Sequence, residues 1–169
     1  NHGDGWSIKD PMQTNGPASA ISWDDESGNY LSIAEGDLDL ALGAYVKEYG
    51  KLGVIGFDAC NMATFEVGHS LKNYAEYMSA SQATVGMLGY QYNLTLDMVH
   101  ENSKVDAFAV ADQLVYDAAE INGEWTQSVS DLSKMDNVGA SLDALAGWAL
   151  EDLEVRSSVI HAAIDEARG

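Results

Sequence analysis

The sequence has little of several residue types, and each shortage narrows the class of protein. It contains one cysteine and two prolines in 169 residues. A single cysteine excludes an internal disulfide, and so few prolines leave room for long helices. No apolar run approaches the roughly 20 residues that a membrane span needs. We therefore expect a soluble, globular protein with no membrane span, long enough to bury a hydrophobic core.

Basic residues are also scarce. Eight Lys and Arg face 27 Asp and Glu, which gives a formal net charge of −19. A surface this negative repels phosphate backbones, so nucleic acid is not an expected partner. It attracts cations such as basic peptides or divalent ions. High solubility, or adaptation to salty surroundings, explains the same charge without any ligand.

Apolar periodicity predicts one α/β domain over residues 1–169. Turn formers dominate residues 1–30 and indicate a loop. Helical spacing is found in residues 37–49, 62–73, 94–101, 105–121, 133–153 and 152–168. Strands are predicted over residues 30–33, 52–57, 74–81 and 125–132. The strand at 52–57, the helix at 62–73 and the strand at 74–81 make a βαβ unit, which favours a parallel sheet buried on both faces.

Cys60 follows the apolar strand at its carboxyl end. Ligands of open parallel sheets bind at such ends. A helix beginning close to Cys60 would favour the thiolate, which is the form that attacks a carbonyl. The alternative is that this lone cysteine is a small buried hydrophobic residue.

Two further side chains are candidates for a site. His2 stands in Asn-His-Gly-Asp-Gly, where glycines let the backbone approach a substrate. Taken alone, however, His2 is better interpreted as a solvated loop residue. Asp58 lies two positions before Cys60, and its carboxylate is solvated, holds a cation or caps a helix. The remaining histidines, in predicted helices, are expected to have packing or surface roles. These are His69, His100 and His161.

Together these features resemble the clostripain family of cysteine peptidases. His-Gly lies in a Gly-rich loop, and residues 56–63 read Gly-Phe-Asp-Ala-Cys-Asn-Met-Ala. The similarity continues through Glu-Val at 66–67, Tyr-Ala-Glu-Tyr at 74–77 and Ser-Ala-Ser-Gln at 79–82. Ser-Asp-Leu-Ser-Lys at 130–134, followed by a helix rich in Leu and Ala, is also similar.

The resemblance implies an endopeptidase that cleaves after Arg or Lys. Cys60 would attack the scissile carbonyl, and His2 would protonate the leaving amine and then activate water. The backbone N–H groups of Gly3 and Cys60 would form the oxyanion hole. Asp58 would line the pocket for the basic P1 side chain, because a carboxylate can pair with Arg.

The resemblance also implies a caspase-like, three-layer α/β fold, in which helices flank a mostly parallel sheet. Family members have strands before the His-Gly loop, and this chain shows none. A second chain, or residues outside this sequence, would supply them, so a fragment or processed chain of a longer, secreted or cell-envelope protein is expected. Lys9 is a candidate self-cleavage site. The chemistry requires no cofactor, although calcium dependence occurs in the family.

Two other interpretations stay open. The domain could be a catalytically inactive, caspase-like binding or regulatory module. A metallohydrolase is less favoured, because the sequence has no HExxH or similar spacing. No Asp-rich loop has the spacing typical of calcium ligands either.

Overall fold

The computed structural model divides the chain into two compact units, Asn1–Ser133 and Lys134–Gly169. The structure describes Gly3, Gly5 and residues 20–24, 26–86, 88–122 and 126–168. Each unit is considered by itself, and the prediction of a single peptidase domain stays a prediction.

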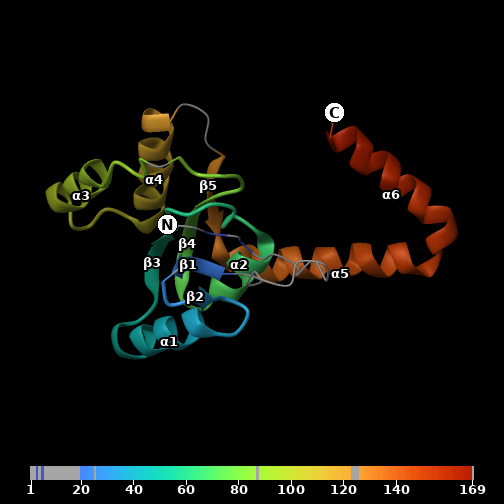
Figure 1. Cartoon of the computed structure of the whole chain (residues 1–169), viewed down its shortest axis with the longest axis horizontal. Helices are drawn as coiled ribbons and strands as arrows, with labels where there is room; N and C mark the ends of the chain where they lie inside the picture. Colours follow the sequence, from blue (N-terminus) through green and yellow to red (C-terminus); the bar gives the residue numbers. More distant parts are fainter. Residues whose placement is uncertain are drawn as a thin grey trace. The chain divides into compact units, whose positions relative to one another are not determined.

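The first unit is built on a sheet of three described strands in the order β3–β4–β5 (Figure 1). These strands are β3 (Leu52–Gly56), β4 (Ala75–Ser81) and β5 (Gln127–Asp131). β3 and β4 are parallel, which confirms the βαβ unit, whereas β5 runs antiparallel to β4. The described sheet is therefore mixed.

The strand β3 is less buried than its apolar sequence suggested. Its first four residues are half-buried and Gly56 is exposed. Burial on both faces, the expectation for this run, is wrong because β3 lies at an edge of the described sheet, paired only with β4. β4 is the central strand, and five of its seven residues are buried.

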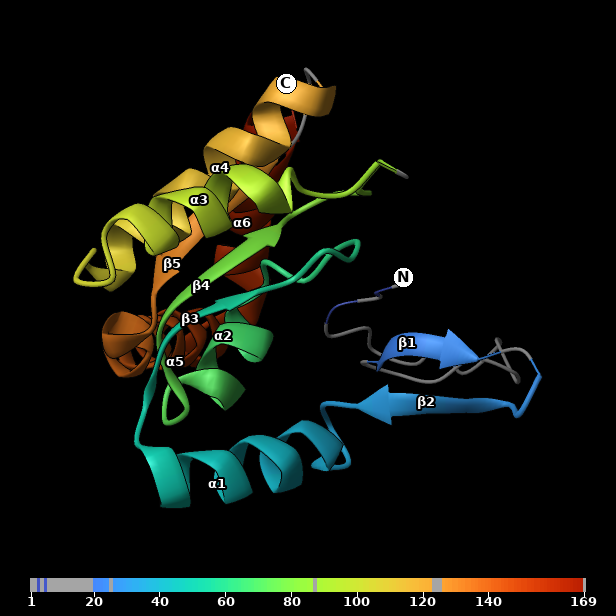
Figure 2. The same cartoon turned by 90° about the vertical axis from the view of Figure 1, so that its left-hand side faces the viewer.

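Helices cover both faces of this sheet (Figure 2). On one face, α4 (Ala107–Asn122) packs on all three strands, and α3 (Tyr92–Glu101) packs on α4. Close packing needs small residues: a Cβ at Gly53 would lie 3.0 Å from Ala107 Cβ, and one at Gly56 would lie 3.1 Å from Leu114 Cδ1. The glycines of β3 therefore make room for α4.

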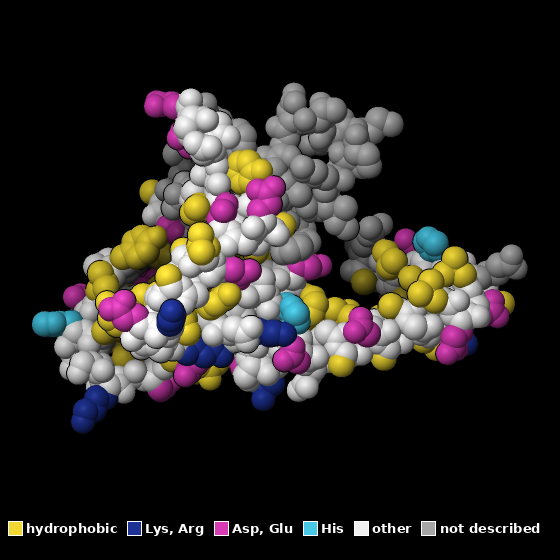
Figure 3. Space-filling model, turned by 90° about the horizontal axis from the view of Figure 1, so that it is seen from below, with side chains coloured by type: hydrophobic (Ala, Val, Ile, Leu, Met, Phe, Trp, Pro, Cys, Tyr) yellow, Lys and Arg dark blue, Asp and Glu magenta, His cyan; other side chains and the backbone are white. Residues whose placement is uncertain are grey.

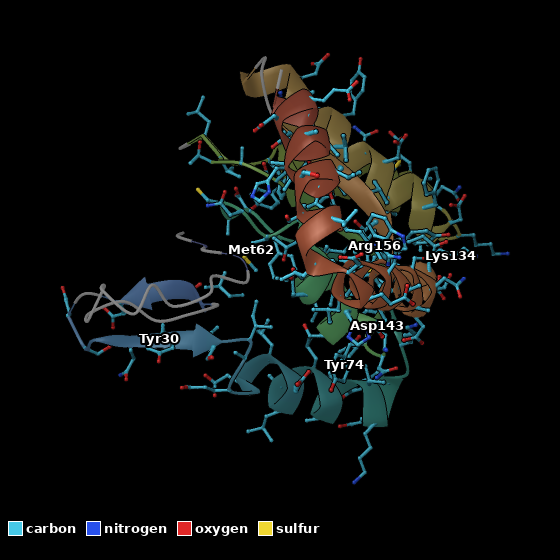
Figure 4. All side chains as sticks on the ribbon, turned by 90° about the vertical axis from the view of Figure 1, so that its right-hand side faces the viewer. Tyr30, Met62, Tyr74, Lys134, Asp143 and Arg156 are labelled. Carbon is cyan, nitrogen blue, oxygen red and sulfur yellow. The ribbon has the colours of Figure 1, made fainter. Side chains whose placement is uncertain are left out.

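On the other face, α2 (Phe65–Leu71) inserts Val67 and Leu71, both fully buried. The helix α1 (Asp37–Tyr49) precedes β3 and buries no residue of its own. Gly43 of α1 faces the ring of Tyr74, which Figure 4 labels beside this helix. The core thus lies on the two faces of the sheet, between α2 and α4.

A hairpin of β1 (Ala20–Asp24) and β2 (Asn29–Ser32) precedes α1. The assignment of residues 1–30 as loop is wrong for β1. Its turn signals are real, since Asp24 accepts hydrogen bonds from Glu26 N (3.0 Å) and Ser27 Oγ (2.5 Å). They mark the turn between the two strands, and cross-strand pairing with β2 outweighs the weak strand propensity of β1.

The second unit consists of α5 (Met135–Glu151) and α6 (Leu153–Arg168), after a short 3-10 turn, η1 (Leu132–Lys134). Helices were predicted here, and the break falls at Asp152, whose Oδ1 accepts a hydrogen bond from Val155 N at 3.2 Å. Arg156 of α6 (labelled in Figure 4) pairs with Glu151 at 2.9 Å and lies over the Trp148 ring. In the described residues, no helix combines the length and apolar character needed to cross a bilayer.

Candidate active site

The site forms where β3 ends. Phe57 N donates to Ser79 O at 2.9 Å, which prolongs the pairing of β3 with β4 by one residue. The chain then leaves the sheet. Side chains alternate here: Phe57 and Ala59 are buried, whereas Asp58 and Cys60 are half-buried. Cys60 and Asp58 therefore lie at the carboxyl end of the strand, as predicted, and both side chains are partly accessible.

A sharp turn separates Cys60 from the next helix. Asn61 has φ 58°, a left-handed conformation that asparagine tolerates better than most residues. Asn61 N donates to Ala83 O at 3.1 Å. Met62 is fully buried (Figure 4). This turn fixes the backbone of Cys60 against the segment after β4.

The helix expected from residue 62 begins later than predicted. α2 starts at Phe65, and Thr64 is its N-cap, with Oγ1 accepting a hydrogen bond from Val67 N at 3.4 Å. Cys60 therefore precedes the first helical turn by several residues. Because the field of a helix end falls off within its first turn, the helix-dipole argument for Cys60 is weaker than the sequence suggested.

The contact that the structure does show for the sulfur comes from the loop between β4 and α3. Val85 N donates to Cys60 Sγ at 3.2 Å. A backbone N–H aimed at sulfur stabilises negative charge there and fixes the side-chain rotamer. The nucleophile candidate is thus held by a backbone group that no side-chain pattern reveals.

Gly3 packs directly on Cys60. A Cβ at Gly3 would lie 2.6 Å from Cys60 O, 2.9 Å from Ala59 Cβ and 3.0 Å from Met62 Sδ. Gly3 also forms an antiparallel bridge with Ile21. No larger residue fits here without displacing the segment. Gly3 thus allows close approach to the backbone of Cys60, and the expected approach to a substrate stays a prediction.

Gly5 makes a similar approach, since a Cβ there would overlap Asn61 O and its φ is 58°. Two positions near the start of the chain thus lie against the backbone of Cys60 and Asn61. His2, which immediately precedes Gly3, and Lys9 are outside the described residues.

Asp58 is enclosed by the same loop that reaches Cys60. Tyr92 donates its hydroxyl to Asp58 Oδ2 at 2.6 Å. Gly89 is buried against the carboxylate, and a Cβ there would overlap Oδ2. Asp58 does not cap α2, since Thr64 does. Of the sequence-based interpretations of Asp58, the helix cap is therefore wrong, and a solvated carboxylate and one that holds a cation both stay predictions.

The ring of Tyr90 packs against the ring of Tyr92. The rings of Tyr90 and Tyr92 meet edge-on, with centroids 5.7 Å apart and planes at 89°. Tyr90 is buried and donates to Phe57 O at 2.8 Å. Gln127 Nε2 bonds to the Tyr90 hydroxyl and to Ser79 Oγ, at 3.2 Å in the latter case. The position of Tyr92 is thereby tied to β3, β4 and β5.

Both tyrosines stay protonated well into alkaline solution. Burial, followed by the hydrogen bond to Asp58 and the charge of that carboxylate, raises the pKa of Tyr92 to about 12. Burial is also the main reason that the pKa of Tyr90 is raised. At neutral pH, Tyr92 is therefore a hydrogen-bond donor to Asp58.

The three histidines that the structure describes lie outside this site. All three are exposed on helices, as expected: His69 on α2, His100 on α3 and His161 on α6. His69 contacts Lys72 Nζ at 2.8 Å, and His161 Nδ1 lies 2.8 Å from Ser157 O.

The acidic side chains form no metal centre in the part of the chain that is described. No group of three or more His, Cys, Asp or Glu side chains there could hold a metal ion. On the face seen in Figure 3, acidic side chains are scattered among other types. Calcium binding stays a prediction.

Comparison with known proteins identifies the family. The fold and the site define an α/β protein with a partly accessible cysteine at the carboxyl end of a strand. The sequence model of the clostripain family, peptidase family C11, matches residues 1–165. The chain therefore belongs to the clostripain family, as its motifs predicted. No curated protein matches the sequence.

Solved structures support the same fold. A secreted C11 cysteine protease from Bacteroides thetaiotaomicron, in complex with an irreversible peptide inhibitor, is 25% identical with a TM-score of 0.59, over 82% of this chain and 40% of that one. A Bacteroides fragilis cysteine protease is 25% identical with a TM-score of 0.53, over 69% and 49%. The B. thetaiotaomicron protease iotapain, at 22% identity and a TM-score of 0.52 over 82% and 39%, shows the fold alone.

These comparisons confirm the mixed α/β architecture with flanking helices, and they support a cysteine peptidase. The chain spans less than half the length of each of these structures, between 39% and 49%.

Proposed function

We propose that the protein is a cysteine endopeptidase that hydrolyses peptide bonds after Arg or Lys, with Cys60 as nucleophile and His2 as acid/base. The observation that carries this proposal is the packing of Gly3 on the backbone of Cys60. In the sequence, His2 is the residue that immediately precedes Gly3. Membership of a cysteine peptidase family supports the same assignment.

The proposed reaction has two stages. The Cys60 thiolate attacks the scissile carbonyl carbon, and the developing oxyanion is stabilised by the backbone N–H groups of Gly3 and Cys60. The C–N bond breaks as His2 protonates the leaving amine, which leaves an acyl group on the sulfur. His2 then takes a proton from water, and the resulting hydroxide attacks the thioester carbon. The C–S bond breaks, which releases the acid product and restores the Cys60 thiolate and the protonated His2.

Asp58 is proposed to bind the basic P1 side chain. It is two residues from Cys60 and half-buried. Among the described residues, its carboxylate has a hydrogen bond only from Tyr92 and no ion pair with Lys or Arg. A partly buried carboxylate without a cation favours a cationic ligand, because an ion pair is worth more in a partly desolvated site than in water.

Three further proposals follow from the same assignment. Lys9 is a self-cleavage site, since it offers a basic P1 residue. Calcium binds the protein, which the charge of −19 favours. The protein acts outside the cytoplasm, as expected if it resembles its secreted relative in location as well as in fold.

A partner strand is proposed for β3. Among the described strands, β3 pairs only with β4, so its other edge carries unpaired backbone groups. Such an edge favours pairing with a strand from a second chain or from residues outside the described part.

Peptide amides that differ only at P1 test the proposal. The protein should hydrolyse the Arg and Lys substrates and not the Leu substrate, and Cys60→Ala should abolish turnover. Asp58→Asn should lower kcat/KM for basic substrates by roughly 30- to 150-fold, about 2–3 kcal/mol, because the substrate cation loses its charged partner. Asp112→Asn, an exposed carboxylate on α4, is the matched control and should change nothing.

Unchanged turnover in Cys60→Ala would contradict the peptidase assignment. Equal rates on Leu and Arg substrates would remove Asp58 from the P1 pocket. If the protein has no thiol-dependent activity and Cys60 reacts slowly with iodoacetamide, with an ordinary thiol pKa near 8.5, the inactive module is the better interpretation.

A further inference from the structure

The loop between β4 and α3 contacts both Cys60 and Asp58. Its Val85 N–H bonds to Cys60 Sγ, and its Gly89 lies against the carboxylate of Asp58. Tyr92, the first residue of α3, donates its hydroxyl to Asp58 Oδ2 at 2.6 Å. The nucleophile and the candidate P1 carboxylate are thus aligned by one segment.

The hydrogen bond from Tyr92 makes the two carboxylate oxygens of Asp58 differ in their surroundings. Oδ2 accepts from Tyr92 and has the backbone of Gly89 against it. Oδ1 accepts no hydrogen bond from the described residues, and a Cβ at Gly89 would still lie 3.3 Å from it. An incoming cation therefore meets one oxygen, Oδ1, with no hydrogen bond from the described residues, and another, Oδ2, that already accepts one and is partly covered by Gly89.

The hydrogen bond from Tyr92 to Asp58 is supported by the packing of the Tyr92 ring on Tyr90. Tyr92 is 52% exposed, but its ring meets the edge of Tyr90, which is 5% exposed and bonded to Phe57 O and Gln127. A surface tyrosine without such support would move freely. Tyr92 instead keeps its hydroxyl on Asp58 while its outer face remains open to a substrate.

Lys and Arg make different demands on a carboxylate. The Arg guanidinium is a rigid planar fork that binds best when both oxygens accept in parallel, whereas the Lys ammonium is a compact charge that needs one oxygen. A carboxylate with one oxygen engaged loses more of its affinity for Arg than for Lys.

We propose that Tyr92 is a specificity-determining residue that, by engaging Oδ2, leaves Asp58 to bind the P1 side chain through Oδ1 and so favours Lys over Arg. The inference rests on the proposed function, because it assigns Tyr92 to the same P1 pocket. It adds a prediction that the pocket carboxylate alone does not make: the preference between the two basic residues depends on a tyrosine hydroxyl.

Removing that hydroxyl tests the inference. In Tyr92→Phe, Oδ2 of Asp58 no longer accepts from the tyrosine hydroxyl, so it can accept from a substrate on the side away from Gly89. The kcat/KM ratio of an Arg peptide amide to the otherwise identical Lys amide should rise about tenfold, the size expected for one hydrogen bond to a charged group. The change should be mainly a lower KM for the Arg substrate, with kcat for both substrates preserved. Tyr116→Phe, an exposed tyrosine on α4, is the matched control and should keep the wild-type ratio.

The outcomes separate the two claims. If Tyr92→Phe hydrolyses both substrates with the wild-type ratio, or favours Lys further, the role of Tyr92 is overturned and the peptidase assignment stands. Equal losses on both substrates would also overturn it, because a loosened site does not discriminate. If the wild type shows no more turnover than Cys60→Ala, both claims fail. Thermal melting checks that Tyr92→Phe is folded, and Tyr92→Leu should raise the ratio in the same direction.

Discussion

Gly89 is the position where a single methyl group would disturb the site most directly. It is buried with φ 65°, and a Cβ there would overlap Asp58 Oδ2 and lie 3.2 Å from Cγ. Gly89→Ala therefore has two costs. A left-handed conformation costs a residue with a Cβ about 1–2 kcal/mol. The carboxylate must also move, which breaks its hydrogen bond from Tyr92, worth about 1.5–3 kcal/mol because the acceptor is charged.

The substitution Gly28→Ala would have the backbone cost without the steric one. It has φ 69°, and a Cβ there meets nothing within 4 Å. Gly28→Ala should therefore show the backbone cost alone. We expect Gly28→Ala to be destabilised by about 1–2 kcal/mol, and Gly89→Ala by about 2.5–5 kcal/mol, the sum of both terms.

Thermal melting and peptide hydrolysis measure the difference. Each kcal/mol should lower Tm by about 2–4 °C in a protein of this size. Gly28→Ala should keep the wild-type kcat/KM on basic substrates, whereas Gly89→Ala should lose about 10- to 100-fold through displacement of Asp58. If both variants melt at the same temperature and cleave equally well, the carboxylate is not held where this reasoning requires it.

The remaining predictions concern other parts of the site and core. Gly3→Ala should lower kcat by about 10²- to 10³-fold, since its Cβ displaces a proposed oxyanion donor from Cys60, and unchanged single-turnover rates would contradict this. Leu71→Ala should lower the free energy of unfolding by about 2–5 kcal/mol in urea titrations, because its side chain is fully buried. Because the pKa of Tyr92 is raised to about 12, its contribution to stability is present below pH 10 and is lost as pH rises from about 10 to 12. Stability in that window should fall less steeply in Tyr92→Phe.

The sequence was most informative about β3 and its carboxyl end. A short apolar run followed by Asp58-Ala59-Cys60 predicts a strand that ends where the polar side chains begin. The following strand, β4, was equally clear, and the parallel pairing followed from the helix between them. Local pattern sufficed because a short apolar run between turn residues is typical of a strand, whatever its burial proves to be.

Elements whose position depends on distant partners were harder to predict. β1 has few strand formers and exists by pairing with β2. The late start of α2 reflects the left-handed Asn61 and the cap at Thr64, neither of which changes the apolar spacing. The antiparallel direction of β5 depends on how the chain returns from α4, which periodicity does not encode.

The role of Tyr92 could not be inferred from spacing either. It lies 34 residues from Asp58, and the two meet only because the loop after β4 folds back over the end of β3. The one available signal was the Gly-Tyr-Gln-Tyr run after a predicted strand, which places tyrosines at the carboxyl edge where sites form. The hydrogen-bond partner of each tyrosine is seen only in the folded structure.

Cys60 and Asp58 are held in place by different kinds of contact. Cys60 is fixed by backbone groups, namely Val85 N on its sulfur and Ala83 O on the residue after it. Substitutions of those side chains leave such contacts in place. Asp58 is instead oriented by the side chain of Tyr92, which one substitution removes. If Asp58 binds the P1 side chain as proposed, a single substitution at Tyr92 should therefore change the P1 preference while Cys60 keeps its position.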